Sequence, residues 1–318
     1  MIKYKPTFLL FVPLLLSSCS NAINLNRSYF YFDTYIQTTL YQGEESDLDD
    51  IDKIFSYYDK ISDNYLARDT FNIYSLNQDN EPHQIDEDFY DLLKVSFDYS
   101  SYEAKYFNPL TGSLAKKWKN ALKNSQLLDE NTINEELEKI NNSSFSLLEG
   151  NYVKRNGEAE IDLGGIVKGY ALDKVYDYLK EKDYKNYLIN GGSSSILLGE
   201  KNNSDGYFNV GISDVSGAYI KAKNCFVSTS SISRQGVTIE DITYSHIINP
   251  FDGSAINPHD AVLVLSDKGY IGDALSTSFM LSSVEEIKQV EISQNVKSVV
   301  IEKEKVVYCH PDIEVQYH

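Results

Sequence analysis

The first third of the chain changes from strand-like to helix-like spacing of its apolar residues. Residues 29–43 (YFYFDTYIQTTLYQG) set β-branched and aromatic residues between polar ones, which predicts a strand or a β-hairpin. Residues 47–61 and 87–105 place their apolar side chains three and four positions apart, so we predict two amphipathic helices there. A turn-rich stretch, FNPLTGSLAKKW, follows the second helix.

The remaining two thirds of the chain predict a mixture of strands and helices. A strand at 159–163, a glycine turn, a helix at 170–182 and a strand at 187–190 form one unit, and the polar residues 129–146 before it are typical of a surface helix and loop. Further strands are predicted from short hydrophobic runs at 208–212, 225–229, 245–248, 261–265, 296–301 and 305–308. Because we find no internal repeat and no linker rich in proline or serine, we predict an α+β fold in one continuous domain.

The charge of the chain limits its possible partners. The 318 residues include 47 acidic and 29 basic side chains, and the formal charge of −18 argues against a nucleic-acid partner, which would need a basic face. A polyanionic ligand would need a bound cation or a few well-placed lysines to offset this charge. Three cysteines occur, at positions 19, 225 and 309, without the CxxC spacing of zinc or thiol redox sites.

The N-terminal segment has the layout of a bacterial export signal. Two lysines precede an apolar run over residues 8–16, which is shorter than the roughly 20 residues of a membrane-spanning helix. The ending LSSC resembles a lipobox, so we predict a lipoprotein signal peptide over residues 1–18, a lipidated Cys19 and a polar tether over residues 19–28. An ordinary cleaved signal is the alternative. The lipoprotein interpretation places the folded part, residues 29–318, on the outer side of the cell membrane.

Residues 162–173 (DLGGIVKGYALD) have the composition of a phosphate site. Paired glycines let the backbone approach a ligand closely, and Lys168 stands where a helix start offers free amides to an anion. Neither the Walker pattern nor GxGxxG is present, and a glycine turn used only for packing is the alternative. A second glycine pair follows the strand at 187–190, at a strand end where ligands often bind.

Two further segments carry candidate chemistry. Asp273 and Thr277 are four residues apart on one helical face, a carboxylate and a hydroxyl that suit Mg²⁺ bound together with phosphate oxygens. Simple capping of the helix by Asp273 is the alternative. His246, in SHIINPFDG, is one of five histidines and has the chemistry of a general base, or else a structural role. The hydroxyl-rich residues 228–233 (STSSIS) fit either phosphate contacts or an ordinary turn.

Taken in order, these segments resemble the ApbE-type FAD:protein FMN transferases over essentially the whole chain after the signal. The resemblance is carried by DLGGIVKGYALD, NGGSSS, STSS, SHIINPFDG and DALST, and FNPLTGSLAKKW is similar to the family pattern FDPTxGPLxxxW. It implies an ApbE-like α+β fold of mixed β-sheets with flanking helices. It also implies a defined reaction that uses Mg²⁺ and FAD. In this reaction the FAD pyrophosphate is cleaved and AMP is released. The FMN part is attached by a phosphoester to a Thr or Ser of an extracytoplasmic acceptor protein.

The resemblance also assigns residues. It assigns Asp273, Thr277 and the backbone carbonyl of Gly165 to the metal, with Ser276 as a further metal candidate. It gives His246 the role of taking the proton from the acceptor hydroxyl. The positions that match FAD-contacting residues are Phe32, Tyr65, Tyr106, Phe107, Asn108, Asp162, Lys168 and Ile248.

The chain departs from the family pattern at four positions. Asn249 replaces an acid and Asp252 a threonine of HxxDPxTG, Asn108 replaces the acid of FDP, and Ser231 replaces the glycine of a TSG loop. Asparagine keeps an acceptor oxygen but loses the charge. Two alternatives therefore stay open: a Mg²⁺-dependent FAD pyrophosphatase that yields FMN and AMP, and a flavin-binding lipoprotein without catalysis.

Overall fold

A computed structural model describes residues 24–101, 103–192, 194–233 and 235–318. The predicted signal peptide and Cys19 lie outside these residues, so the lipid anchor stays a prediction. Within the described ranges, no helix combines the length and the apolar character that crossing a membrane requires.

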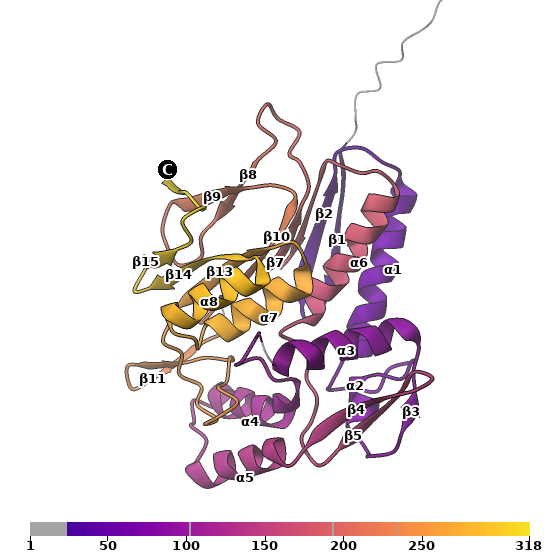
Figure 1. Ribbon diagram of the computed structural model, residues 1–318, viewed down its shortest axis with the longest axis vertical. Helices are drawn as coiled ribbons and strands as arrows, with labels where there is room; N and C mark the ends of the chain where they lie inside the picture. The colour runs from indigo at the N-terminus through magenta and orange to yellow at the C-terminus, as the bar shows by residue number, and fades with distance from the viewer. Residues whose placement is uncertain (1–23, 102, 193, 234) are drawn as a thin grey trace, which may run out of the picture.

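Eight antiparallel strands form the largest sheet in the described part of the chain, in the upper half of the view in Figure 1. In spatial order these strands are β1 (Leu25–Tyr31), β2 (Thr34–Leu40), β6 (Tyr187–Gly191), β7 (Ser195–Leu198), β10 (Cys225–Ser231), β13 (Ala261–Ser266), β14 (Lys297–Glu302) and β15 (Lys305–Cys309). Three smaller sheets have the orders β16-β9-β8, β3-β5-β4 and β11-β12. Their strands are β3 (His83–Gln84), β4 (Ser144–Leu148), β5 (Tyr152–Asn156), β8 (Phe208–Gly211), β9 (Ala218–Ala222), β11 (Val237–Ile239), β12 (Ile242–Tyr244) and β16 (Val315–Tyr317).

Helices α1 (Glu45–Ser62), α6 (Val167–Glu181), α7 (Gly269–Phe279) and α8 (Val284–Gln294) pack beside the large sheet, and other helices form much of the lower half of the molecule (Figure 1). These other helices are α2 (Ile73–Leu76), α3 (Glu87–Ser101), the 3₁₀ turn η1 (Pro109–Thr111), α4 (Gly112–Lys123) and α5 (Glu130–Asn141). The α+β class of mixed sheets and flanking helices is therefore confirmed.

The central strands are buried on both faces. Along β13, the side chains of Val262 and Val264 enter the core beneath α1, α6 and α7, whereas those of Ala261 and Leu263 enter a second core beneath the β16-β9-β8 sheet. Because successive residues of a strand point to opposite faces, a strand between two cores is apolar at every position. This explains the continuous run AVLVL.

Of the two structures predicted for residues 29–43, a strand or a hairpin, the chain forms the hairpin, which begins earlier than expected. β1 and β2 pair antiparallel around a turn at Phe32 and Asp33, which both have positive φ, as a tight two-residue hairpin turn requires. β1 starts at Leu25 within the segment 19–28 that we predicted to be a tether, so that boundary is wrong. The four polar-rich residues LNRS belong to an edge strand, where Arg27 binds Glu45 of α1 at 2.9 Å.

Two predicted strands are absent from the described chain, and one helix is longer at its start. Residues 159–163 are extended but pair with loops: Ile161 and the side chain of Asn77 exchange hydrogen bonds of 2.8 and 3.0 Å, and the amide of Asp162 donates to Pro109 at 2.8 Å. Residues 245–248 form a loop after β12. Both segments contain buried apolar residues. Apolar character alone does not distinguish a strand from a buried loop, so both strand predictions were wrong. The helix predicted at 170–182 begins at Val167.

Helices α6 and α7 cross at two glycines. A Cβ atom on Gly169 would stand 2.1 Å from the carbonyl oxygen of Gly269, so no side chain fits at this crossing. We expect Gly169→Ala to lower the free energy of unfolding by about 1–3 kcal/mol, the range of overpacking substitutions, in chemical denaturation. Gly211→Ala is the matched control, because a Cβ there meets nothing within 4 Å. Equal stability of the two variants would contradict the close crossing.

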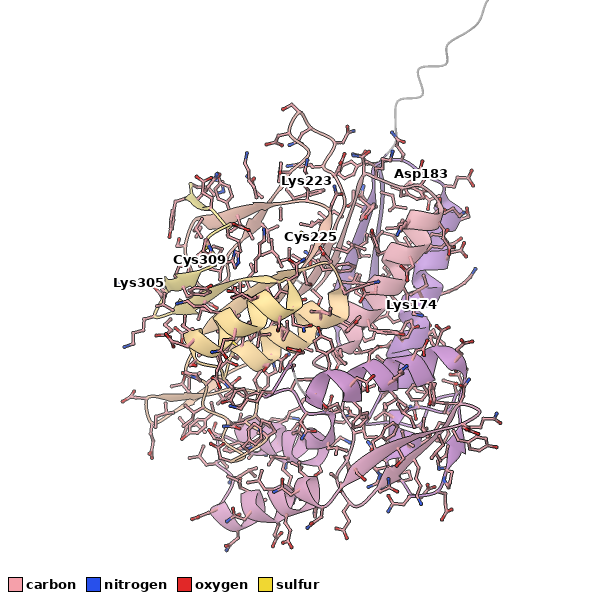
Figure 2. The ribbon with its side chains drawn as sticks, viewed as in Figure 1. Lys174, Asp183, Lys223, Cys225, Lys305 and Cys309 are labelled. Atoms are coloured by element: carbon pink, nitrogen blue, oxygen red, sulfur yellow. The ribbon has the colours of Figure 1, made fainter. Side chains whose placement is uncertain are left out.

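Cys225 and Cys309 do not pair. They lie on β10 and β15, which are separated by β13 and β14, and Figure 2 shows them in different parts of the sheet. Three strand spacings amount to about 14 Å, whereas a disulfide needs Cα atoms within about 7 Å. Burial raises the pKa of the Cys225 thiol to about 12, so this cysteine is unreactive at neutral pH.

Candidate functional site

The glycine turn leads into α6 and puts Lys168 in its first turn. The turn is fixed by Asp162, whose Oδ1 accepts from the amide of Gly164 at 2.7 Å. The amides of Gly165 and Lys168 have no hydrogen-bond partner among the described residues. Free amides at a helix start beside a lysine ammonium group form a place for an anion.

Asp273 of α7 lies against this helix start. Its Oδ2 accepts from the amide of Gly169 at 2.7 Å, and its Oδ1 accepts from the hydroxyls of Ser195 and Ser228 at 2.7 and 2.6 Å. Burial raises the pKa of Asp273, while the Lys168 ammonium and the three donors favour the ionised form. Three donors leave one of the roughly four lone pairs of the carboxylate unused, on Oδ2. Asp273 and Lys168, although far apart in sequence, therefore belong to one site.

The other residues assigned to the metal lie on the same side of α7 or next to it. The Oγ1 atom of Thr277 would stand 3.4 Å from a Cβ on Gly165, and it has no hydrogen-bond partner in the described chain. Ser276 differs, because its hydroxyl donates to the carbonyl of Asp273 and pairs with the hydroxyl of Ser230, both at 3.0 Å. One carboxylate, one free hydroxyl and a nearby carbonyl fit Mg²⁺, which binds few protein oxygens and keeps other ligands. The described residues contain no group of three or more His, Cys, Asp or Glu side chains that would hold a metal by themselves.

Two aromatic positions assigned to FAD lie beside these residues. The ring of Phe107 is 3.1 Å from the place of a Cβ on Gly165, and the amide of Tyr106 donates to the hydroxyl of Ser278 in α7 at 3.1 Å. The ring of Tyr106 packs edge-on against the exposed Phe251, with centroids 5.6 Å apart. Flat rings beside a glycine turn suit a stacked heteroaromatic group.

Three other residues assigned to FAD lie on separate segments. Phe32 is in the turn of the β1–β2 hairpin, and within the described residues no hydrogen bond or ring contact joins it to Asp273, Thr277 or Gly165. Tyr65 is 47% exposed, and the ammonium groups of Lys116 and Lys119 each lie 4.9 Å from the centre of its ring. Ile248 is buried and belongs to the same loop as His246.

His246 lies in a loop that is anchored to α4. The indole of Trp118 donates to the carbonyl of Gly253 in this loop at 2.9 Å. Solvent reaches part of the imidazole, but protein atoms closely surround the rest of the ring. The resulting loss of hydration disfavours the charged form and lowers the pKa of His246 to about 4. The ammonium groups of Lys168 and Lys119 act in the same direction. A neutral, accessible imidazole near Lys168 is able to accept a proton at neutral pH.

Removing one of these charges tests the electrostatics of the site. We expect Lys119→Gln to raise the pKa of His246, because one nearby positive charge no longer opposes protonation of the ring. In the unchanged protein the ring should stay neutral until the pH falls toward about 4. An NMR titration of the histidine ring protons measures both values. Lys123→Gln, at the exposed end of the same helix, is the control. Identical titration curves for Lys119→Gln and the unchanged protein would contradict the prediction.

The departures from the family pattern serve local structure. Asn108 Oδ1 accepts from the amide of Leu110 at 2.9 Å and begins η1, and Asn249 Oδ1 accepts from the amide of Phe251 at 3.0 Å. Asp252 accepts from the amide of Ser254 in the same way, at 2.8 Å. Capping needs only an acceptor oxygen, which asparagine supplies as well as aspartate does.

Sequence reasoning missed several residues of this site. The serines of NGGSSS and STSS seemed suited to a ligand, but Ser195 and Ser228 bind Asp273. Lys119 was missed because nothing in the sequence places α4 beside the His246 loop.

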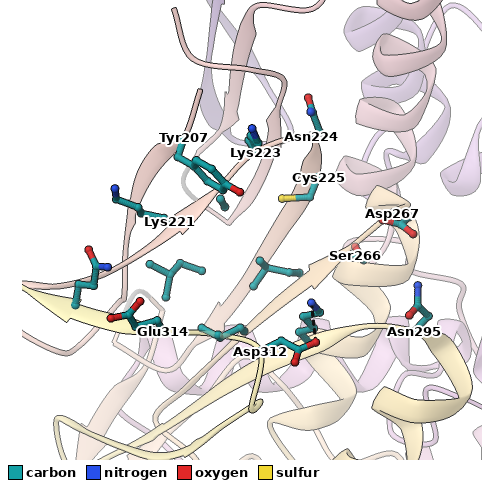
Figure 3. Close-up of a pocket in the computed structure, with 16 residues that line it drawn as sticks. Tyr207, Lys221, Lys223, Asn224, Cys225, Ser266, Asp267, Asn295, Asp312 and Glu314 are labelled. Atoms are coloured by element: carbon teal, nitrogen blue, oxygen red, sulfur yellow. Dashed lines mark ion pairs between the residues drawn. The ribbon is translucent and has the colours of Figure 1, made fainter. Parts of the chain in front are cut away.

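A cavity of about 640 Å³ opens elsewhere, between the β16-β9-β8 sheet and the large sheet (Figure 3). Lys223 and Cys225 point into it, and Lys297 and Asp312 form an ion pair of 3.1 Å at its wall. None of the residues assigned to FAD or to the metal lines this cavity.

The fold, together with the glycine turn, places the protein in a structural class, which is the flavin-transferase fold of ApbE structures. The chain matches the crystal structure of the ApbE protein of Thermotoga maritima with a TM-score of 0.75, at 19% identity, over 93% of this chain and 97% of that one. The chain belongs to the ApbE family, whose sequence profile matches residues 32–300.

Curated relatives agree with this assignment. An FAD:protein FMN transferase of Treponema pallidum is 25% identical over 218 residues, which span 62% of this chain and only 60% of that protein. An FAD:protein FMN transferase of Chlamydia pneumoniae is 24% identical over 284 residues, 86% of this chain and 89% of that one.

Proposed function

We propose that this chain is a Mg²⁺-dependent FAD:protein FMN transferase. The observation that carries the proposal is the meeting of Lys168, Asp273, Thr277 and Gly165 at the crossing of α6 and α7. The names of the curated relatives support the choice of FAD as substrate and of a protein as acceptor.

The proposed reaction is a phosphoryl transfer. The oxygen of a Thr or Ser hydroxyl on the acceptor forms a bond to the phosphorus on the FMN side. The bond from this phosphorus to the bridging oxygen breaks, and AMP leaves with that oxygen. Catalysis of this kind depends on positioning and on neutralising charge.

Each residue has a place in this proposal. The free amides of Gly165 and Lys168, with the lysine ammonium, hold the pyrophosphate, and His246 takes the proton from the acceptor hydroxyl. Asp273, Thr277 and the carbonyl of Gly165 would hold Mg²⁺, which when bound offsets phosphate charge in a protein of net charge −18. Tyr106 and Phe107 would stack on the flat rings of FAD.

The test is a labelling assay. The purified protein is incubated with FAD, Mg²⁺ and candidate acceptors from extracytoplasmic redox systems, and a flavin-fluorescent acceptor band that survives denaturation is expected, together with AMP. Release of FMN and AMP without an acceptor would instead identify a pyrophosphatase, which the solvent access of His246 keeps as the second candidate. Tight FAD binding without turnover under any metal would identify a carrier, and the proposal would be wrong.

We also propose that Cys19 carries a lipid that holds the protein on the outer side of the cell membrane. The support is the lipobox-like LSSC and the short spacing of Cys19 from the start of β1 at Leu25. Incorporation of a labelled fatty acid into the cellular protein, lost in Cys19→Ala, is the expected result. Labelling that persists in this variant would contradict the anchor.

A further inference from the structure

The prediction that the chain has no internal repeat is wrong, because a short one coincides with the helix crossing. KGYALD at 168–173 opens α6, and KGYIGD at 268–273 opens α7. The two copies meet face to face, since a Cβ on Gly169 would stand 2.1 Å from the oxygen of Gly269, and one on Gly269 would stand 2.2 Å from the oxygen of Gly169. The rings of Tyr170 and Tyr270 also face each other, with centroids 6.3 Å apart.

The two copies exchange their aspartates. Asp273 of α7 accepts from the amide of Gly169 in α6 at 2.7 Å. Asp173 of α6 accepts from the amides of Gly269 and Tyr270 in α7, each at 2.9 Å. Neither helix has a side-chain cap at its own N-cap residue. Each helix start therefore receives a carboxylate from the other helix, while the amide of Lys168 stays free of any partner among the described residues.

The two exchanged aspartates differ in their partners. Asp273 lies near Lys168 and, besides the amide of Gly169, accepts from the hydroxyls of Ser195 and Ser228. Asp173 is 5% exposed, and its hydrogen bonds among the described residues come from the backbone amides of Gly269 and Tyr270. The lysine of one copy and the aspartate of the other therefore belong to the candidate site, while Asp173 binds the start of α7.

We propose that Asp173 is a positioning residue for the metal site, because it fixes the start of α7 against α6 and thereby sets Asp273 and Thr277 relative to Gly165 and Lys168. This inference rests on the proposed function. The three cross-helix hydrogen bonds are the ones that set the register of the two helices at the glycine contact. Without Asp173 two of them are lost, and a displacement of α7 moves both metal candidates together. Groups that orient metal ligands typically affect affinity about 10–100-fold.

The experiment measures metal binding directly, with Mn²⁺ as the probe in the presence of ADP and with free Mn²⁺ followed by electron paramagnetic resonance. Asp173→Asn keeps one acceptor oxygen and removes the other, and we expect Mn²⁺ binding to weaken about 10–100-fold. FAD binding in the presence of a chelator, followed by flavin fluorescence, should stay unchanged. Glu291→Gln is the matched control. Glu291 of α8 is 4% exposed and accepts from the amide of Ser298 of β14 at 2.7 Å, and neither residue is assigned to the site.

A second pair of variants keeps the test decisive where Asp173→Asn folds poorly. Asp173→Glu keeps both acceptor oxygens on a longer side chain, and Asp173→Gln has the same shape with only one acceptor oxygen for the amides of Gly269 and Tyr270. Weaker Mn²⁺ binding in the glutamine variant than in the glutamate variant supports the inference.

The outcomes separate this inference from the proposed function. Mn²⁺ binding in Asp173→Asn equal to that in Glu291→Gln, or equal binding in Asp173→Glu and Asp173→Gln, overturns the positioning role alone. If the unchanged protein binds no Mn²⁺ with ADP, the metal part of the proposed function fails and this inference fails with it.

Discussion

Asp273→Asn is expected to reduce Mg²⁺-dependent transfer of FMN by about 10²-fold or more, comparable with the loss of one electrostatic stabiliser of a transition state. The asparagine keeps an oxygen for the hydroxyls of Ser195 and Ser228 but removes the charge that would hold the cation. Its amide group also faces the amide of Gly169, so one buried donor loses its partner at a cost of about 1–3 kcal/mol in stability. Flavin fluorescence on the denatured acceptor and a chemical denaturation curve measure the two effects.

The matched control for Asp273→Asn is a buried carboxylate with no place in the site. Glu136 is fully buried and accepts from Ser113, Lys117 and Lys139, where it joins α4 to α5. These partners lower the pKa of Glu136 to about 2, so Glu136→Gln should reduce stability while the transfer rate of the folded protein is retained. A folded Asp273→Asn protein that transfers FMN at the unchanged rate would rule out the role of Asp273.

His246→Ala is expected to reduce transfer by about 10²–10⁴-fold, the range for loss of a positioned general base. FAD binding should persist, since the anion contacts of the proposed site come from Gly165 and Lys168. Because the pKa is about 4, His246 stays neutral and able to accept a proton from neutral pH down to about pH 5. The transfer rate should therefore not fall as the pH is lowered from about 7 to about 5. Rate profiles against pH with the unchanged protein, and FAD titrations with the variant, measure these effects.

His83→Ala is the control for the histidine replacement. The imidazole of His83 pairs with Asp79 at 2.7 Å and packs on Phe71, in the β3 region of the lower half of the molecule. Its removal should leave transfer unchanged. Full transfer by His246→Ala would show that another group, or no protein group, takes the proton of the acceptor.

The local pattern of the sequence was sufficient where neighbouring residues decide the structure. The helical spacing of residues 47–61 predicted α1, and the alternation before it predicted the β1–β2 hairpin. The same reasoning failed for residues 159–163 and 245–248, which are apolar without being strands. Whether a buried extended segment joins a sheet depends on which backbone lies beside it, and here Asn77 and Pro109 satisfy the backbone of the first segment.

In the candidate site, too, local sequence predicted some features and the tertiary structure alone showed others. Lys168, His246 and Asp273 were predicted from their motifs, because residue types and short spacings carry that signal. The hydrogen bonds of Asp273 to Ser195 and Ser228 were not, since they join three segments that are distant along the chain. The roles of Asn108 as the cap of η1 and of Asn249 in a turn also became clear only from the amides that they bind.

The sequence by itself determined the family resemblance, the helices and strands with clear periodicity, the acidic charge and the residue types available for phosphate chemistry. Only the tertiary structure decided that KGYALD and KGYIGD cross at their glycines, and that each helix start is bound by the other helix's aspartate. Periodicity reports the contacts of a residue with its neighbours in the chain. A hydrogen bond between residues 169 and 273 depends on the packing of two helices, which no local pattern specifies.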